Sequence, residues 1–358
     1  MVQEPKLPYF DGLRLDTEKE KSRLLRKRPG SSFRRRNIML IIQKFGGSSL
    51  DGLERLRRSA QIVKDAVVSG HKCVAVVSAA GDSTDALAEL AGKIDPGHSK
   101  REKDALMSTG EQQSAALMAM MLGSMGVEAL SLTGWQSGIY TNSIHADADV
   151  EQTLPWRVTA ALRQNKTPVV TGFQGLDVKG DVTTLGRGGS DTTAVALAAA
   201  LGAERCRIYS DVAGVYTADP RLIKDARHMP LMDMRDMLTL AHSGSQLLHA
   251  KSVALAMAED VELELYSSFG EDQMSVVRRL EDEERPDYAG VTRDTERSQL
   301  TLVGKACTVQ TLRDISALLK DEGMEVLGGR AGEGFCWVKL APTQLSYAAE
   351  LVHREYLT

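Results

Sequence analysis

From residue 39 onward, short apolar runs alternate with longer stretches in which apolar residues recur at every third or fourth position. The short runs are rich in Val, Ile and Tyr, which is typical of buried strands. The longer stretches are rich in Ala, Leu, Met and Glu, which favours helices. We expect strands at residues 39–43, 73–78, 127–132, 168–172, 207–210 and 261–266, and helices at residues 51–69, 102–122, 155–164, 191–202 and 233–258.

This alternation predicts an α/β fold with a mainly parallel central sheet covered by helices on both faces. Sheets of this kind bind ligands beyond the carboxyl ends of their strands, in the loops that open the helices. We therefore expect the chemistry of the chain to lie in its strand-to-helix loops.

A second, smaller unit is predicted at the C-terminal end. Residues 271–288 are rich in charge, and we interpret them as a linker between a larger domain at 39–270 and a module at 289–358. The pattern after the linker predicts a βαββα order, which is a small α+β module. Its expected elements are strands at 299–303, 324–328 and 335–340 and helices at 309–322 and 344–356.

Composition narrows the class of protein. The chain is 42% hydrophobic and 26% charged, which is ordinary for a globular protein and excludes fibrous architectures. Its four cysteines lie far apart, which excludes a disulfide scaffold and a Cys-rich zinc site and favours the cytoplasm. No apolar run approaches the roughly 18 residues that a membrane helix needs.

The net charge of −4 hides an asymmetry between the start of the chain and the rest. Residues 1–38 hold 11 Lys and Arg against 5 Asp and Glu, so they carry +6, whereas residues 39–358 carry −10. No apolar core marks a secretory signal, and the acidic residues argue against an organellar presequence. We interpret this leader as a disordered tail, and hypothesise that translation begins at Met39; a native mass that includes residue 1 would refute the latter.

The first candidate loop, residues 44–49, reads Lys-Phe-Gly-Gly-Ser-Ser directly after the first strand. Gly46 and Gly47 let backbone N–H groups approach an anion, and Lys44 adds a full charge. Taken alone, the hexapeptide is better explained as a glycine-rich turn with a surface lysine. It is not a Walker A loop, because G-x-x-x-x-G-K-[ST] is absent.

The second candidate loop, residues 183–193, contains further glycines and opens a helix of Ala, Val and Leu. Arg187 could bind a carboxylate through its planar fork, while Ser190 or Asp191 caps the helix. An ordinary capping loop is the alternative. Two glycine-rich loops with cations in one sheet together indicate a site for two anionic substrates, such as a nucleotide and an acidic acceptor.

Further polar segments lie near expected helix starts and strand ends. Residues 210–221 combine an aromatic, carboxylates and a cation, as recognition of a nucleoside requires, although a long packed loop is the alternative. Glu111, in Ser-Thr-Gly-Glu-Gln, could bind the ammonium group of an amino acid or simply be a first-turn helix carboxylate. His145, His242 and His249 lack metal-ligand spacing and are interpreted as surface or packing residues.

Taken in order, these segments resemble the aspartate kinases of the amino acid kinase superfamily. The resemblance spans about residues 39–270 and is specific as a set. The segments that carry it are K-F-G-G-S-S (44–49), V-S-A-A-G-D-S-T-D (77–85), S-T-G-E-Q (108–112), S-L-T-G-W-Q (131–136), T-G-F-Q-G (171–175), T-T-L-G-R-G-G-S-D-T-T-A (183–194) and S-D-V-A-G-V-Y-T-A-D-P-R (210–221).

The resemblance implies transfer of the γ-phosphoryl group of MgATP to the β-carboxylate of L-aspartate, giving 4-phospho-L-aspartate and ADP. The implied catalytic residues are Lys44, Arg187 and Asp191. The residues implied to bind aspartate are Thr84, Glu111, Arg187, Gly188, Gly189 and Ser190. The residues implied to bind ATP are Lys44, Phe45, Gly46, Gly47, Ser210, Asp211, Tyr216, Arg221, Gln246 and Leu247; no protein metal ligand is implied, since Mg²⁺ is held by phosphates and water.

Two departures from the family pattern bear on function. The family typically has G-[AS]-K-[VI]-L where this chain has Gly-Ser-Gln-Leu-Leu at 244–248, so Gln246 stands in place of an ATP-contacting lysine and a raised KM for ATP is expected.

After the kinase domain, the family usually has two ACT domains. Here the segment 289–358 has room for one ACT-like unit, whose helix-opening turn at 304–308 lacks the D-x-P-G pattern. We expect weak feedback regulation and a homodimer or larger homo-oligomer assembled through this unit.

Two other functions remain as alternatives. The first is a non-catalytic amino-acid or nucleotide-binding regulatory subunit of the same fold, against which the joint retention of Lys44, Glu111, Arg187 and Asp191 argues. The second is a nucleic-acid binder with a basic arm, which rests only on residues 1–38 and is opposed by the acidic body. The expected protein is a cytoplasmic enzyme of amino-acid biosynthesis that acts on neither nucleic acid nor membranes.

Overall fold

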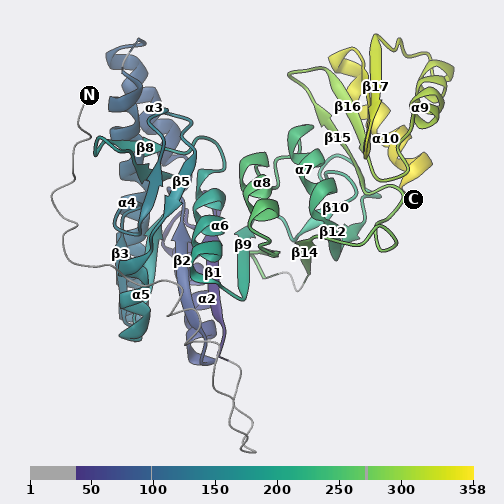
Figure 1. Ribbon diagram of the computed structural model, residues 1–358. Helices are drawn as coiled ribbons and strands as arrows, with labels where there is room; N and C mark the ends of the chain where they lie inside the picture. The colour runs from purple at the N-terminus through teal and green to yellow at the C-terminus, as the bar shows by residue number, and fades with distance from the viewer. Residues whose placement is uncertain (1–37, 98, 271–272) are drawn as a thin grey trace, which may run out of the picture. The chain divides into compact units, whose positions relative to one another are not determined.

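Eight strands form the central sheet. They are β1 (Leu40–Phe45), β2 (Lys72–Val77), β3 (Ala129–Leu132), β6 (Thr167–Thr171), β9 (Arg205–Ser210), β12 (Leu231–Asp233), β13 (Leu263–Ser267) and β14 (Met274–Arg278). Their order is β12-β14-β13-β9-β1-β2-β6-β3, and neighbours pair in parallel except β13 and β14 (Figure 1). The predicted fold class is confirmed.

The computed structural model describes residues 38–97, 99–270 and 273–358. The predicted leader before residue 38, and with it the hypothesis about the start of translation, lies outside the described residues.

Helices cover both faces of the central sheet, because successive strand residues face opposite sides. Ile41 packs in one apolar cluster with α2 and α4, whereas its neighbour Ile42 packs in the other with α5, α6, α7 and α8 (Figure 1). Both isoleucines are fully buried. The helices are α2 (Leu53–Val68), α3 (Ser83–Ile94), α4 (Lys100–Ser124), α5 (Trp156–Arg163), α6 (Gly189–Leu201), α7 (Met234–His242) and α8 (Ala250–Ala258), with a 3-10 turn η1 (Gly47–Ser49).

The single helix predicted at 233–258 is wrong. The structure has two helices, α7 and α8, separated by residues 243–249. Gly244 in this break has φ of +106°, and a Cβ there would lie 2.6 Å from the carbonyl oxygen of Arg293. The apolar spacing continues through residues 243–249, so the sequence pattern does not predict this break. The helix ends because Gly244 adopts a positive φ and because the backbone of Arg293 approaches it closely.

A second, four-stranded sheet was not predicted. Its strands are β4 (Ile139–Thr141), β5 (Val150–Thr153), β7 (Gln174–Leu176) and β8 (Val182–Thr184), in the order β5-β4-β7-β8. A two-stranded ribbon of β10 (Val215–Tyr216) and β11 (His228–Met229) was missed as well. All of these strands are too short for an alternating pattern to identify.

The C-terminal module contains one strand more than the predicted βαββα order. It has β15 (Gly290–Asp294), β16 (Gln299–Val303), α9 (Val309–Asp321), β17 (Gly328–Gly332), β18 (Phe335–Lys339), a 3-10 turn η2 (Pro342–Gln344) and α10 (Leu345–Tyr356). The antiparallel sheet runs β15-β16-β18-β17, so the additional β15 forms one edge. The strand predicted at 324–328 overlaps β17 only at Gly328; Met324 packs in the module core before the strand begins.

The predicted linker at 271–288 contains part of the central sheet. Strand β14 pairs with both β12 and β13, so residues 274–278 belong to the larger fold rather than to a connecting segment. The proposed domain boundaries otherwise stay predictions. None of the helices in the described part of the chain is both long and apolar enough to cross a membrane.

Candidate active site

The first glycine-rich loop lies where β1 ends, between two neighbouring strands. The N–H of Gly46 donates a hydrogen bond to the carbonyl of Tyr209 on β9, at 3.2 Å. On the other side, a Cβ on Gly47 would lie 2.7 Å from the carbonyl oxygen of Ala79, beyond β2. Only glycine allows this close approach, so the loop is held against the backbone on both sides.

Lys44, which lies on β1 and is the first residue of this glycine-rich segment, forms an ion pair with Asp191 in the first turn of α6. Lys44 Nζ lies 2.6 Å from Asp191 Oδ1, with side-chain exposures of 11% and 10%. The two residues come from the two glycine-rich loops, which lie far apart in the sequence, at 44–49 and 183–193. The structure therefore brings together the predicted cation and the predicted carboxylate.

The second glycine-rich loop approaches α8 very closely. Gly188 has φ of +73° and caps α6, and a Cβ there would lie 2.1 Å from the Cβ of His249. His249 was interpreted as a surface or packing residue; it packs directly on the loop that bears Arg187 and Ser190. Ser190 is buried, with its Cβ 2.6 Å from the position that a Cβ on Gly172 would take. Arg187 is exposed and has no ion pair with any other described residue.

Glu111 lies in the middle of α4, so the alternative of a first-turn helix carboxylate is wrong. Its Oε1 accepts a hydrogen bond from the N–H of Ala79, at 3.0 Å. Its Oε2 is buried without a hydrogen-bond partner among the described residues. Burial raises the pKa of Glu111 to about 7, although the Ala79 N–H opposes this rise.

Ala79 connects Glu111 to the first glycine-rich loop. Its N–H contacts Glu111, and its carbonyl packs against Gly47. A Cβ on Gly110 would lie 2.9 Å from the Cβ of Ala79, so a glycine lets α4 approach this point. The sequence analysis missed Ala79, because it acts through its backbone and carries no side-chain signal. Thr84 lies half-buried in the first turn of α3, which packs on α4.

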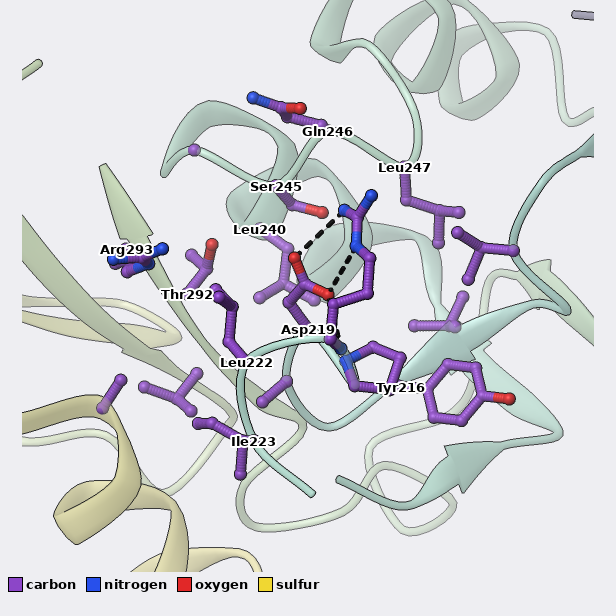
Figure 2. A pocket seen from close by; sticks show the side chains of 18 of the residues that line it. Tyr216, Asp219, Leu222, Ile223, Leu240, Ser245, Gln246, Leu247, Thr292 and Arg293 are labelled. Carbon is purple, nitrogen blue, oxygen red and sulfur yellow. Dashed lines mark hydrogen bonds and ion pairs between the residues drawn. The ribbon is translucent and has the colours of Figure 1, made fainter. Parts of the chain in front are cut away.

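A cavity of about 390 Å³ lies beyond the ends of β9 and β10. Six of the residues predicted to bind ATP line it: Ser210, Asp211, Tyr216, Arg221, Gln246 and Leu247 (Figure 2). Lys44 and the first glycine-rich loop do not line the cavity. The first glycine-rich loop lies next to the cavity, because the N–H of Gly46 is hydrogen-bonded to the carbonyl of Tyr209, which precedes the lining residue Ser210 in the sequence.

Within the cavity, Arg221 is already engaged. Its guanidinium donates two hydrogen bonds of 3.0 Å to the two carboxylate oxygens of Asp219 (Figure 2). Burial alone would raise the pKa of Asp219, but this pairing and the more distant Arg293 hold it below its usual value. Asp219 therefore engages two of the five N–H donors of Arg221 and compensates most of its charge.

A serine that the sequence analysis missed connects the nucleotide segment to the first loop. Ser268, just after β13, lies with its Oγ 2.8 Å from the Oγ of Ser49 and donates to the carbonyl of Ser210 at 2.9 Å. Ser49 and Ser268 come after β1 and β13, and Ser210 ends β9, which lies between these two strands in the sheet. The only signal in the sequence was a pair of serines after a buried strand.

His145 lies near two carboxylates, although the sequence showed no metal-ligand spacing for it. Ligand atoms of His145, Asp177 and Asp181 lie within 4.8 Å of one another. Each group has a partner of its own: His145 bonds Asp104, Asp177 accepts from Ser143, and Asp181 pairs with Arg101. Because each of the three side chains is held by a partner of its own, we interpret the cluster as part of a network that stabilises the fold.

Comparison with known proteins identifies the family. The amino acid kinase family profile matches residues 39–266. An aspartokinase of Geobacillus stearothermophilus is 43% identical over 288 residues, which cover 80% of this chain and 71% of that protein. The chain belongs to the aspartokinase family. An aspartokinase of Corynebacterium efficiens is 45% identical over 271 residues, and the match covers 75% of this chain and 64% of that relative.

Solved structures of this family share the fold. Aspartokinase III of E. coli, in complex with aspartate and ADP, superposes with a TM-score of 0.77 at 20% identity, covering 89% of this chain and all of that one. The aspartate kinase from Synechocystis superposes with a TM-score of 0.62 at 27% identity, covering 88% of this chain and 69% of that one. The predicted family is confirmed, whereas the role of each site residue stays a prediction.

Proposed function

We propose that this chain transfers the γ-phosphoryl group of ATP to the β-carboxylate of L-aspartate, giving 4-phospho-L-aspartate and ADP. The observation that carries this proposal is the link through Ala79 between the Gly47 loop and Glu111. It sets a phosphate-binding loop beside a buried carboxylate oxygen without a partner among the described residues, which suits the ammonium group of an amino acid. Membership of the aspartokinase family supports the same substrates.

The reaction needs positioning and charge stabilisation more than acid–base chemistry. The acceptor carboxylate is already ionised at neutral pH, so no general base has to remove a proton. One of its oxygens forms a bond to the γ-phosphorus while the bond from that phosphorus to the bridging oxygen of ADP breaks. The transition state is loose and highly charged, so cations and N–H groups supply most of the catalysis.

Each site residue has a proposed task in that step. Lys44 stabilises charge on the transferring phosphoryl group, and Asp191 fixes its ammonium group at 2.6 Å. Gly46 and Gly47 bring backbone N–H groups to the phosphates. Glu111 holds the ammonium group of aspartate, while the exposed guanidinium of Arg187, with Ser190 and Thr84, binds its carboxylates.

The described residues fit a Mg²⁺ ion that is held by ATP rather than by the protein. Asp191, the buried carboxylate beside the first loop, is paired with Lys44 through Oδ1, and this pairing compensates its charge. Mg²⁺ retains water and commonly binds through substrate phosphates, so few protein ligands are needed. When bound, the ion would neutralise phosphate charge.

A hydroxylamine trap tests the reaction directly, because acyl phosphates yield hydroxamates. With ATP, Mg²⁺ and L-aspartate, the purified protein should produce hydroxamate, and Lys44→Ala should abolish it. Absence of hydroxamate with well-folded protein would favour the non-catalytic regulatory subunit instead. We further propose a cytoplasmic location, a role in the biosynthesis of aspartate-derived amino acids, and a homo-oligomer assembled through the C-terminal module.

A further inference from the structure

One wall of the nucleotide cavity comes from the C-terminal module. Residues of β15 and α10, namely Val291, Thr292, Arg293, Ser346 and Ala349, line the cavity together with the segment that bears Tyr216 and Arg221. Figure 2 shows Thr292 and Arg293 on the side away from Tyr216. The module is therefore part of the site rather than a remote appendage.

Buried hydrogen bonds attach this wall to the nucleotide segment. The N–H of Val291 donates to the carbonyl of Thr217 at 2.8 Å. The hydroxyl of Thr217 also lies 2.8 Å from Nε2 of His353 on α10, and both residues are buried. Thr217 directly follows Tyr216, so the position of the module and the shape of the cavity are fixed by the same contacts.

The module also contacts the loop that bears Gln246. Gly244 packs so closely on Arg293 that a Cβ would lie 2.6 Å from its carbonyl oxygen. Gln246 and Arg293 both line this cavity (Figure 2). Gln246 is neutral, and the arginines among the residues that line the cavity are Arg221 and Arg293.

Two guanidinium groups line the cavity, and they differ in their partners. Arg221 forms a bidentate pair with Asp219. Arg293 donates to the hydroxyl of Ser346 at 2.7 Å and forms no ion pair with a carboxylate in the described part of the chain. A guanidinium bound only to a hydroxyl keeps most of its N–H donors and its charge for a ligand. Its planar fork matches the oxygens of a phosphate group.

We propose that Arg293 binds the phosphate groups of the nucleotide in this cavity, so that the C-terminal module contributes a substrate-binding residue. The inference rests on the proposed function for the identity of the nucleotide. It places a cation of the module where the loop at 244–247 offers only a neutral amide. If Arg293 binds the nucleotide, a movement of the C-terminal module also moves a nucleotide-binding residue and so changes nucleotide affinity directly.

The test compares Arg293→Gln with wild-type protein by calorimetric titration with MgADP and by steady-state kinetics. We expect the Kd for MgADP and the KM for ATP to rise about tenfold, as for loss of a charge-assisted contact. The KM for aspartate and kcat should stay within about twofold, since the lost contact acts on nucleotide binding alone. Arg293→Lys, which keeps a point charge without the fork, should give an intermediate Kd.

Arg330→Gln is the matched control, because Arg330 is an exposed arginine on β17 of the same module, outside the cavity. Its kinetics and its MgADP affinity should equal those of the wild type. A Kd for MgADP within twofold of wild type in a folded Arg293→Gln variant would overturn the proposal. Equal rises in the KM values for ATP and aspartate would also overturn it, because they would indicate that the substitution disturbs the structure of the cavity rather than one nucleotide contact. Wild-type protein that yields no hydroxamate would instead refute the proposed function.

Discussion

The ammonium group of Lys44 and the carboxylate of Asp191 lie 2.6 Å apart at the junction of the two glycine-rich loops. The ammonium group of Lys44 pairs with one carboxylate oxygen, and with three N–H donors it keeps further donors for a phosphoryl group. The pair is nearly buried, so each charge depends on the other for compensation.

Removing Lys44 should therefore affect both catalysis and stability. Lys44→Met should lower kcat by about 10³-fold, the upper end of what loss of one preorganised donor costs. It should also lower the free energy of unfolding by about 3–5 kcal/mol, because Asp191 is left charged and without its cation. Hydroxamate assays and urea unfolding measure the two effects.

The double variant Lys44→Met with Asp191→Asn is the control for the stability effect. It should recover most of the lost stability, since no uncompensated charge remains, while staying inactive. Equal stability of the single and double variants would show that the pair is not electrostatically coupled.

Glu111 should make activity depend on pH near neutrality. Its carboxylate has to be ionised to bind the ammonium group of aspartate, and burial raises its pKa to about 7. We expect kcat/KM for aspartate to fall as the pH drops below about 7, while the KM for ATP changes little. A pH profile from 5.5 to 8.5 measures this; a flat profile would exclude Glu111 as the ammonium ligand.

The raised pKa of Glu111 affects stability in the opposite direction from activity: activity falls as the pH drops, whereas stability falls as the pH rises. The folded-state pKa lies above the unfolded-state value, so the folded protein binds the proton more tightly and stability falls as pH rises between about 4.5 and 7. Above pH 7, Glu111→Gln should stabilise the fold by up to about 3 kcal/mol, with no gain below about pH 4.5. Unfolding midpoints of both proteins across this range test the sign.

Much of the site could be predicted from the sequence, and the reason is topological. Lys44 lies at the carboxyl end of a strand and Asp191 in the first turn of a helix, and in a parallel sheet such positions converge at one edge. The roles of Ala79 and Arg293 could not be predicted in this way. Ala79 acts through its backbone, and Arg293 reaches the cavity only because β15 packs on Thr217. Neither contact leaves a periodic signal in the chain.

The two ends of α6 offer a matched pair of glycines. Gly188 and Gly202 both have positive φ, at +73° and +60°, but only Gly188 meets another residue. Gly202→Ala should cost about 1 kcal/mol of stability and leave kinetics unchanged. Gly188→Ala adds a clash with His249, which should displace Arg187 and raise the KM for aspartate at least about tenfold. An unchanged KM for aspartate in Gly188→Ala would show that the loop at 183–193 does not contribute to binding of the aspartate acceptor.

Gln246 should limit affinity for ATP. It is exposed at the cavity and carries no charge, whereas a lysine there would add a cation beside the phosphates. Gln246→Lys should lower the KM for ATP several-fold, with kcat changed little. Gln246→Met, similar in length but uncharged, should not lower it. If Gln246→Lys leaves the KM for ATP unchanged, the side chain does not face the nucleotide.

The start of α9 bears on regulation by amino acids. Thr308 and Thr311 cap each other: each side-chain oxygen accepts a hydrogen bond from the backbone N–H of the other, at 3.3 and 3.1 Å. N–H groups satisfied in this way are not free to bind the carboxylate of an effector. We therefore expect lysine and threonine at millimolar concentrations to cause little inhibition, because the N–H donors that an effector carboxylate needs are already engaged. Inhibition curves for each amino acid, at ATP and aspartate concentrations near their KM values, provide the measurement. Strong inhibition that persists in Thr308→Ala would place an effector site elsewhere in the chain, whereas strong inhibition lost in that variant would show that the capped turn opens to bind it.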